Sequence, residues 1–185
     1  RRPPRSTLSS SSAASDVYKR QVLKGDGSCS KYMVRLGTKT PEFNFEFEKN
    51  LKAIGLNPKT RYSEKWNRWD TRACSRLFAK WYKNLKIEDF RRILATREMK
   101  QEFIRGFYES EGTKYRIDKN GFRLGFSNTN RETMMLVQEI LRDLGYNFNL
   151  GFEHSANRKD IFVLRNAKRS EVCRFIEEIH PVIKR

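Results

Sequence analysis

Histidine, cysteine and long apolar runs are scarce in this sequence, and each shortage excludes a class of protein. Only His154 and His180 are present, which argues against catalysis that depends on a histidine base. The three cysteines, Cys29, Cys74 and Cys173, are widely spaced, so they match no zinc pattern and suit a reducing compartment. No run approaches the roughly 18 apolar residues of a membrane helix, and no secretory signal is visible. We therefore expect no membrane partner and a location in prokaryotic cytoplasm or an organelle.

Acidic residues are also in the minority. The 185 residues include 39 Lys and Arg against 22 Asp and Glu, a net charge of 39 − 22 = +17. Such an excess is typical of proteins that bind polyanions. Charge alone does not distinguish DNA from RNA or from an anionic membrane surface. Residues 1–21 are rich in Ser, Pro and Arg and lack apolar periodicity, so we predict a disordered tail, foreign to the rest of the chain.

One short motif combines a helix with an acid at its end. In the stretch from Ile104 to Gly112, Gly106 would let a partner helix approach closely, and Gly112 would end the helix in the left-handed conformation. Glu111 then lies at the negative end of the helix dipole, where a cation would stabilise it. The pair Asp26-Gly27 repeats this ending after Val22, although the preceding residues 19–21 (KRQ) break the apolar pattern and make the first helix degenerate.

The sequence around this motif is repeated. The segment from Leu124 to Asn128 matches that from Val34 to Thr38 at an offset of 124 − 34 = 90, and Gly145 falls on Gly55 at the same offset. Alternation of apolar residues predicts strands, including one with Tyr32, Val34 and Leu36 on its inner face, and 3.6-residue spacing predicts helices. Each half therefore reads helix, strand, strand, helix, strand, strand, helix, with halves at 22–98 and 99–185. Residues 84–98 are predicted to be a polar connector.

The nonapeptide from Ile104 to Gly112, its partial copy ending at Asp26-Gly27 and the repeat together resemble the LAGLIDADG homing endonuclease family over residues 22–185. The resemblance implies an α+β fold in which two pseudo-symmetric αββαββα repeats form a DNA-binding saddle of two antiparallel sheets. Trp66 and Trp69 are expected in the core, with a place beside the groove as the alternative.

The same resemblance implies the site. Asp26 and Glu111 would be the catalytic acids and would hold Mg²⁺ or Mn²⁺, with Gly25 and Ser110 beside them. Lys39 and Lys114 would lie near the nucleophilic water; phosphate contact or plain solvation is the alternative for each lysine. Thr38 and Asn128 are paired polar positions at the ends of matched strands. The residues expected to bind DNA are Lys31, Arg35, Thr38, Arg61, Lys65, Arg72, Arg116, Asp118, Arg123, Asn128, Asn147, Asn149, Arg158 and Arg165.

The implied activity is hydrolysis of both strands of a long, near-palindromic or asymmetric duplex DNA site by a monomer. Two alternatives stay open at this point. One is an RNA maturase that binds its own intron RNA and assists splicing, and the other is a catalytically inactive DNA-binding module.

Overall fold

The computed structural model describes residues 27–113, 116–118, 121–154 and 160–182. The elements of the first half are β1 (Gly27–Cys29), β2 (Met33–Thr38), α2 (Pro41–Ala53), β3 (Lys59–Ser63), the 3₁₀ turn η1 (Glu64–Trp66), β4 (Arg68–Cys74) and α3 (Arg76–Lys83). Those that follow are α4 (Ile87–Ile93), α5 (Arg97–Glu111), β5 (Arg116–Asp118), β6 (Gly121–Asn128), α6 (Arg131–Asp143), β7 (Asn149–Glu153), β8 (Ile161–Asn166) and α7 (Arg169–Ile179). No helix among the described residues is long and apolar enough to cross a membrane.

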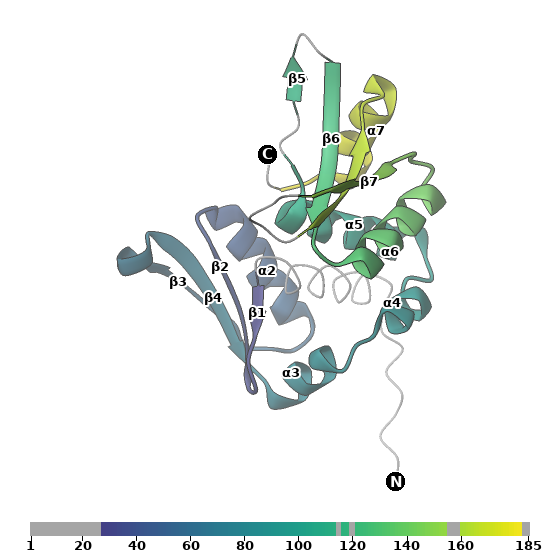
Figure 1. Ribbon diagram of the computed structural model, residues 1–185. Helices are drawn as coiled ribbons and strands as arrows, with labels where there is room; N and C mark the ends of the chain where they lie inside the picture. Colours follow the sequence, from purple (N-terminus) through teal and green to yellow (C-terminus); the bar gives the residue numbers. More distant parts are fainter. Residues whose placement is uncertain (1–26, 114–115, 119–120, 155–159, 183–185) are drawn as a thin grey trace.

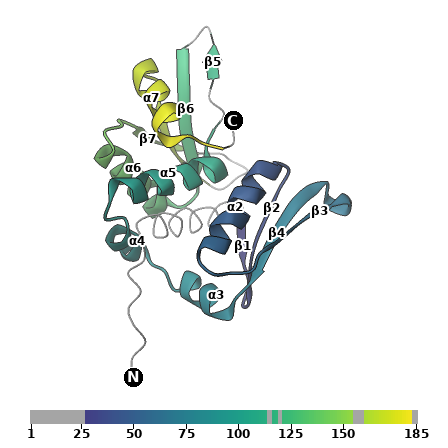
Figure 2. The same ribbon diagram turned by 180° about the vertical axis from the view of Figure 1, so that it is seen from behind.

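The strands form two antiparallel sheets of four, in the orders β1-β2-β4-β3 and β5-β6-β8-β7. Figures 1 and 2 show the sheets as two separate wings, with α5 between α2 and α6 in both views. The predicted α+β class and the pair of antiparallel sheets are therefore confirmed. The predicted first helix of the first repeat lies outside the described residues.

From its first strand onward, each half has the same order of strands and α-helices, β1-β2-α2-β3-β4-α3 in the first and β5-β6-α6-β7-β8-α7 in the second. The helices α2 and α6 begin at Pro41 and Arg131, an offset of 131 − 41 = 90, and β3 and β7 share it, at 149 − 59 = 90. Gly55 (φ 78°) and Gly145 (φ 86°) follow these helices in the left-handed conformation, where glycine carries no steric penalty. Beyond β7 the offset rises to 93. Thr38 pairs with Trp69 and its counterpart Asn128 pairs with Phe162, which gives 162 − 69 = 93.

Alternation along β2 separates the core from the opposite face of the first sheet. Val34 and Leu36 are buried together with Phe43 and Phe47 of α2, while Arg35 belongs to the other phase of the strand. This opposite face, which carries the residues that alternate with the buried ones, is called the outer face below. Tyr32 was predicted to point inward with Val34 and Leu36, but it precedes β2 and is 52% exposed.

Among the described residues, the second half has the larger of the two cores. Phe126 of β6 is fully buried, and its ring lies 5.8 Å from that of Tyr108 and 6.0 Å from that of Phe175, measured between centroids. The prediction of a polar connector over 84–98 was wrong. Part of it is α4, whose Phe90 is buried in this core 5.9 Å from the ring of Phe103. The sequence did not predict this helix because charged residues separate its apolar positions, which makes the segment look like a polar connector.

The expected placement of the tryptophans also needs correction. Trp66 is 60% exposed at the tip between β3 and β4, and the Lys65 ammonium lies 5.3 Å from its ring centroid. Trp69 is half-buried and packs against Phe45 and Tyr62, with ring centroids 5.4 and 5.5 Å apart. The β3–β4 hairpin extends past the end of α2 (Figure 1), so that helix covers only the base of the hairpin.

An ion contact joins the two halves between α2 and α5. Arg105 lies 3.4 Å from Glu46 of α2 and 2.5 Å from Glu102 on its own helix, and all three side chains are largely shielded. Burial raises the pKa of Glu102, although the nearby charge of Arg105 opposes the increase. Because each of these shielded charges needs its partner to offset the cost of desolvation, the network favours one specific arrangement of α2 against α5.

A buried carboxylate organises the end of the second sheet. Glu171 of α7 accepts hydrogen bonds from the Asn147 amide (2.9 Å) and from Asn166 Nδ2 (2.8 Å). The hydrogen bond from the Asn147 backbone is the largest cause that holds the pKa of Glu171 below its ordinary value; burial opposes it, and Asn166 and Lys168 add to it.

Glu171→Gln is expected to lower the free energy of unfolding at pH 7 by about 1–3 kcal/mol, because buried donors lose a charged acceptor. The folded-state pKa is depressed, so this contribution is present above the unfolded pKa of about 4.3 and is lost as pH falls through the folded value. Urea unfolding of both proteins from pH 7 to pH 3 should show the difference shrinking below about pH 4. Glu177→Gln, an exposed position of the same helix, is the control; equal effects at both positions would contradict the assignment.

Candidate nucleic-acid interface

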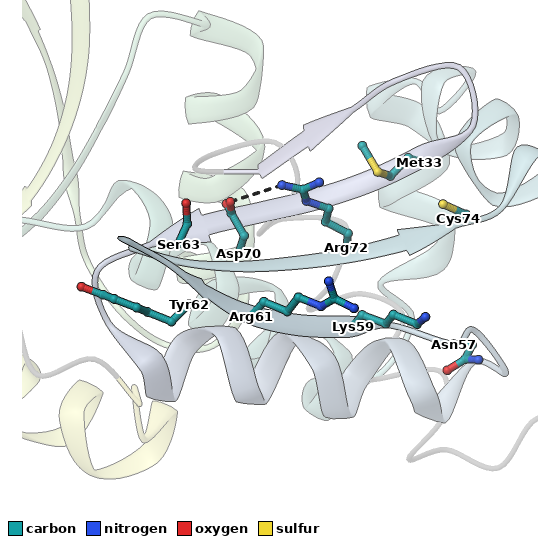
Figure 3. A pocket seen from close by; sticks show the side chains of 9 residues that line it. All are labelled: Met33, Asn57, Lys59, Arg61, Tyr62, Ser63, Asp70, Arg72 and Cys74. Carbon is teal, nitrogen blue, oxygen red and sulfur yellow. Dashed lines mark ion pairs between the residues drawn. The ribbon is translucent and has the colours of Figure 1, made fainter. Parts of the chain in front are cut away.

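The outer face of the first sheet is hollowed and basic. A cavity of about 730 Å³ is lined by Met33, Asn57, Lys59, Arg61, Tyr62, Ser63, Asp70, Arg72 and Cys74. Figure 3 shows these side chains, with Lys59 and Arg61 coming from β3 and Asp70 and Arg72 from β4. The predicted DNA-binding residues Arg61 and Arg72 therefore lie in one hollow, and both are exposed.

Asp70 lies among three arginines of this face and is only 4% exposed. Arg35 donates to it from Nε (3.1 Å) and from Nη2 (2.6 Å), one bond to each carboxylate oxygen. Arg68 Nε lies 3.3 Å away and Arg72 Nη2 3.5 Å away. Burial favours the neutral acid, but the hydrogen bond and charge of Arg35 and the charges of the other two arginines outweigh it, so the pKa of Asp70 lies below its ordinary value.

Among the described side chains, the outer face of the second sheet carries fewer charges than that of the first. Arg123, Asn149 and Arg165 are exposed there, and Arg165 is ion-paired with Glu153. Arg116 and Asp118 lie on β5, where Arg116 pairs with Arg123 and Asp118 with Gly121. Asn147, which was expected to bind DNA, lies between α6 and β7, with its backbone amide bound to Glu171.

The other predicted basic and polar residues occupy strand ends and turns. Lys31 precedes β2, Lys39 follows it, and Lys65 lies in η1; all three are exposed. Thr38 and Asn128 do end the matched strands β2 and β6, in the phase of the helix-facing residues. Both make local hydrogen bonds: Thr38 accepts from Asn44 Nδ2 (2.6 Å), and Asn128 accepts from the Asn130 amide (2.8 Å).

The acid of the nonapeptide lies at the predicted end of its helix. Glu111 is the last residue of α5 and is half-buried, and the Ser110 hydroxyl donates within the helix, 3.1 Å to the Gly106 carbonyl. Gly112 was predicted to be left-handed, but its φ of −73° is ordinary. It is required for space instead, because a Cβ there would overlap the carbonyl oxygen and the ring of Tyr108.

The acid-bearing ends of the two halves join their sheets at equivalent places. Gly112 bridges to Phe126 of β6, while Gly27 pairs with Leu36 of β2. Leu36 and Phe126 are themselves equivalent at the offset of 126 − 36 = 90. Glu111 directly precedes Gly112, and Asp26 directly precedes Gly27 in the sequence. Asp26, Gly25, Lys114 and Arg158 lie outside the described residues.

The described part of the chain contains no cluster of three or more His, Cys, Asp or Glu side chains arranged for a metal ion. Magnesium sites on nucleic-acid enzymes use one or two carboxylates together with phosphate oxygens, so a three-residue cage is not required. Glu111 is a carboxylate at a helix C-terminus, where a cation offsets the unfavourable dipole. The residues present therefore fit a divalent metal shared with a phosphate.

Gly112→Ala is expected to destabilise the protein by about 1–3 kcal/mol, since the added methyl group must displace the last turn of α5. Thermal unfolding measures the effect. Gly151→Ala is the matched control, because the nearest atom to a Cβ at Gly151 is 3.8 Å away. Equal melting temperatures for the two variants would show that the end of α5 is not tightly packed.

Two contributors to this surface were missed in the sequence. Asp70 is a lone acid in a basic strand, where nothing in the alternation distinguishes a solvated residue from a buried partner of three arginines. Gly37 lies opposite Asp70 in the β2–β4 pairing, and a Cβ there would come within 2.7 Å of Asp70 Oδ1. For Asp70, the available signal in the sequence was a single acid among the basic residues of the outer phase of its strand.

Comparison with known proteins agrees with this geometry. Residues 98–180 match the family described as LAGLIDADG-like domain. An uncharacterized protein of Methanocaldococcus jannaschii is 29% identical over 151 residues, which are 75% of this chain but only 57% of that protein. The homing endonuclease I-DmoI in complex with DNA and Mn superposes with a TM-score of 0.65 at 20% identity, covering 91% of this chain and 97% of that one. Full-length DUF199/WhiA from Thermatoga maritima gives 0.68 at 15% identity, covering 97% and 59%.

This chain is similar to the LAGLIDADG family over residues 98–180. Its fold is shared with I-DmoI and with the LAGLIDADG domain of WhiA.

Proposed function

We propose that this protein is a site-specific double-strand DNA endonuclease that uses a divalent metal, Mg²⁺ or Mn²⁺, held by Glu111 and Asp26. The observation that carries the proposal is the equivalence of Gly112, which bridges to β6, and Gly27, which pairs with β2, each directly after an acid. Two acids at equivalent positions of a pseudo-symmetric protein match the local two-fold symmetry of duplex DNA. Each acid would then serve one strand.

The chemistry assigned to these residues is phosphodiester hydrolysis. When bound, the metal would activate a water molecule and stabilise the departing 3′ oxygen. Glu111 and Asp26 would hold it against a DNA phosphate, with Ser110 and Gly25 beside them. Lys39, exposed directly after β2, and Lys114 would lie near the attacking water and hold its negative charge. Products would carry 5′-phosphate and 3′-hydroxyl ends.

The protein would act as a monomer, and the outer faces of its two sheets would bind the two halves of a long DNA target. On the first, exposed Arg61 and Arg72 flank the hollow, and on the second, exposed Arg123, Asn149 and Arg165 occupy the corresponding face. Arginine suits guanine and asparagine suits adenine in the major groove. The structural similarity to I-DmoI bound to DNA and Mn supports the same partner and a divalent metal for this chain.

A second candidate is duplex DNA binding without cleavage. It is favoured by the comparable structural similarity to WhiA, with a TM-score of 0.68 against 0.65 for I-DmoI, since WhiA carries no nuclease designation. In that case the basic outer faces keep their role and Glu111 has no metal to hold. The RNA maturase alternative uses the same basic surface for intron RNA.

Cleavage selection on a plasmid library with randomised inserts tests the proposal. We expect linear products with shared sequences at the cut, formed with Mg²⁺ or Mn²⁺ and not with EDTA. Recovery of specific intact duplexes without any linear product would favour the second candidate. Retention of structured intron RNA in preference to any duplex would favour the maturase.

A further inference from the structure

The outer face of the first sheet contains an ordered group that has no equivalent among the described side chains of the second sheet. This group, the arginine cluster, consists of Arg35, Arg68 and Arg72 around Asp70. Asp70 accepts two hydrogen bonds from Arg35, while Arg68 Nε and Arg72 Nη2 lie within ion-pair distance of it, at 3.3 and 3.5 Å. Asp70 therefore engages one edge of each guanidinium, and the side chains of Arg68 and Arg72 remain 34% and 52% exposed.

The backbone around the cluster is shaped for it. Gly37 lies opposite Asp70 in the β2–β4 pairing, and a side chain there would meet Asp70 Oδ1 at 2.7 Å and Arg68 Nε at 3.0 Å. The glycine thus provides the space that the carboxylate and Arg68 occupy. At the offset of 90, the corresponding residue of the second half is Ser127.

The described residues of the second sheet form no equivalent cluster. Gly125 corresponds to Arg35, and a Cβ on it would lie 2.8 Å from the Leu164 carbonyl oxygen. Val163 corresponds to Asp70 at the offset of 163 − 70 = 93, so no carboxylate is present at this position. Only Arg72 has a basic counterpart, Arg165, and that residue is paired with Glu153 instead.

We propose that Asp70 is a positioning residue that fixes the exposed edges of Arg68 and Arg72 for guanine recognition by the first sheet. The inference rests on the proposed function only as far as duplex DNA binding. A guanidinium that presents two N–H groups in a fixed plane matches O6 and N7 of guanine, whereas a mobile one contacts phosphate equally well.

The presence of the acid itself argues for base reading over phosphate contact. Asp70 reduces the charge of the cluster from +3 to +2. Every positive charge on this face would attract DNA phosphates, so the acid lowers that attraction. An acid that is 4% exposed also loses most of its hydration. The first effect weakens general DNA binding and the second costs folding stability, so the residue is useful only where orientation matters more than charge.

Binding selection from a library of duplexes with a long randomised segment tests the proposal, using the full chain in the presence of Ca²⁺. The wild-type protein is expected to select guanines in one half of its site. Asp70→Asn should lose that preference, bind the selected site about tenfold more weakly and bind random-sequence DNA as well as or better than wild type. Its salt dependence on random DNA should be steeper by about one phosphate contact.

Gly37→Ser tests the same idea without a change of charge. It places next to Asp70 a serine, the residue type found at the equivalent position of the second half, Ser127. It should also lower guanine preference while its affinity for random DNA stays within about twofold. Asp143→Asn, on the helix side of the second sheet, removes one negative charge away from the outer faces and should leave the selected sequence unchanged.

Uniform loss of affinity for selected and random DNA by Asp70→Asn would overturn the positioning role and mark Asp70 as structural. Unchanged guanine preference in both Asp70→Asn and Gly37→Ser would overturn it as well. These outcomes differ from failure of the proposed function. If the wild-type protein selects no duplex at all, DNA binding itself is wrong; if it selects guanines but cuts nothing, only cleavage fails.

Discussion

Glu111→Gln is expected to reduce metal-dependent DNA cleavage by about 10³-fold or more, because a metal that stabilises the transition state by several kcal/mol would lose a charged ligand. DNA affinity should stay equal or increase, since the substitution removes a negative charge next to a phosphate. Single-turnover cleavage with Mg²⁺ or Mn²⁺ and equilibrium binding with Ca²⁺ measure the two effects separately. Asp26→Asn, on the equivalent position of the first half, should behave in the same way.

The fold constrains how this result can be interpreted. Glu111 is the last residue of α5 and is only half-buried, so replacement by the isosteric amide should leave the melting temperature nearly unchanged. Glu177→Gln repeats the chemical change at an exposed position of α7 and should cut at the wild-type rate. Cleavage that persists in Glu111→Gln would remove this residue from the metal site, and parallel loss of binding and cleavage would make it structural.

Phe126→Ala is expected to lower the free energy of unfolding by about 3–5 kcal/mol, a large part of the stability of a domain of this size. The ring is fully buried, and its centroid lies 5.5 Å from that of Phe148 and 5.8 Å from that of Phe107, in addition to those of Tyr108 and Phe175. Removing it leaves a cavity that several rigid aromatic rings cannot fill. Chemical denaturation measured by fluorescence gives the difference directly.

The control for this prediction is another phenylalanine of the same sheet. Phe152 of β7 is 56% exposed and contacts Phe162, with ring centroids 5.3 Å apart. Phe152→Ala should cost less than about 1 kcal/mol, because little apolar area leaves contact with protein. A similar cost at both positions would mean that the ring of Phe126 is not enclosed by the core as described.

The repeat was predictable because it depends on local signals. Helix starts such as Pro41, left-handed glycines such as Gly55 and alternation such as that of Val34 and Leu36 each follow from a few neighbouring residues. The same signals recur 90 residues later, which is why the two-sheet α+β fold could be predicted. The acid at the end of α5 was also correctly located at the helix terminus.

What failed to be predicted depends on contacts between distant segments. The short helix α4 gains its stability from the burial of Phe90 against Phe103 rather than from its own sequence. Gly112 is fixed by the ring of Tyr108, not by its dihedral angle. Asp70 acquires its partners Arg35 and Arg68 only when β2 and β4 pair. The pair of Asp26 and Glu111 is in the same category and stays a prediction.

The contacts of α4 determine where this chain could be divided to make hybrids with related proteins. Because Leu85, Ile87 and Phe90 pack into the core of the second half, a fusion joined at residue 98 would remove part of that core and expose apolar side chains. A junction between Lys83 and Leu85 keeps each half with its own hydrophobic interior. Exchange of the first half at that point would transfer one complete sheet with its arginines and leave the rest of the fold intact.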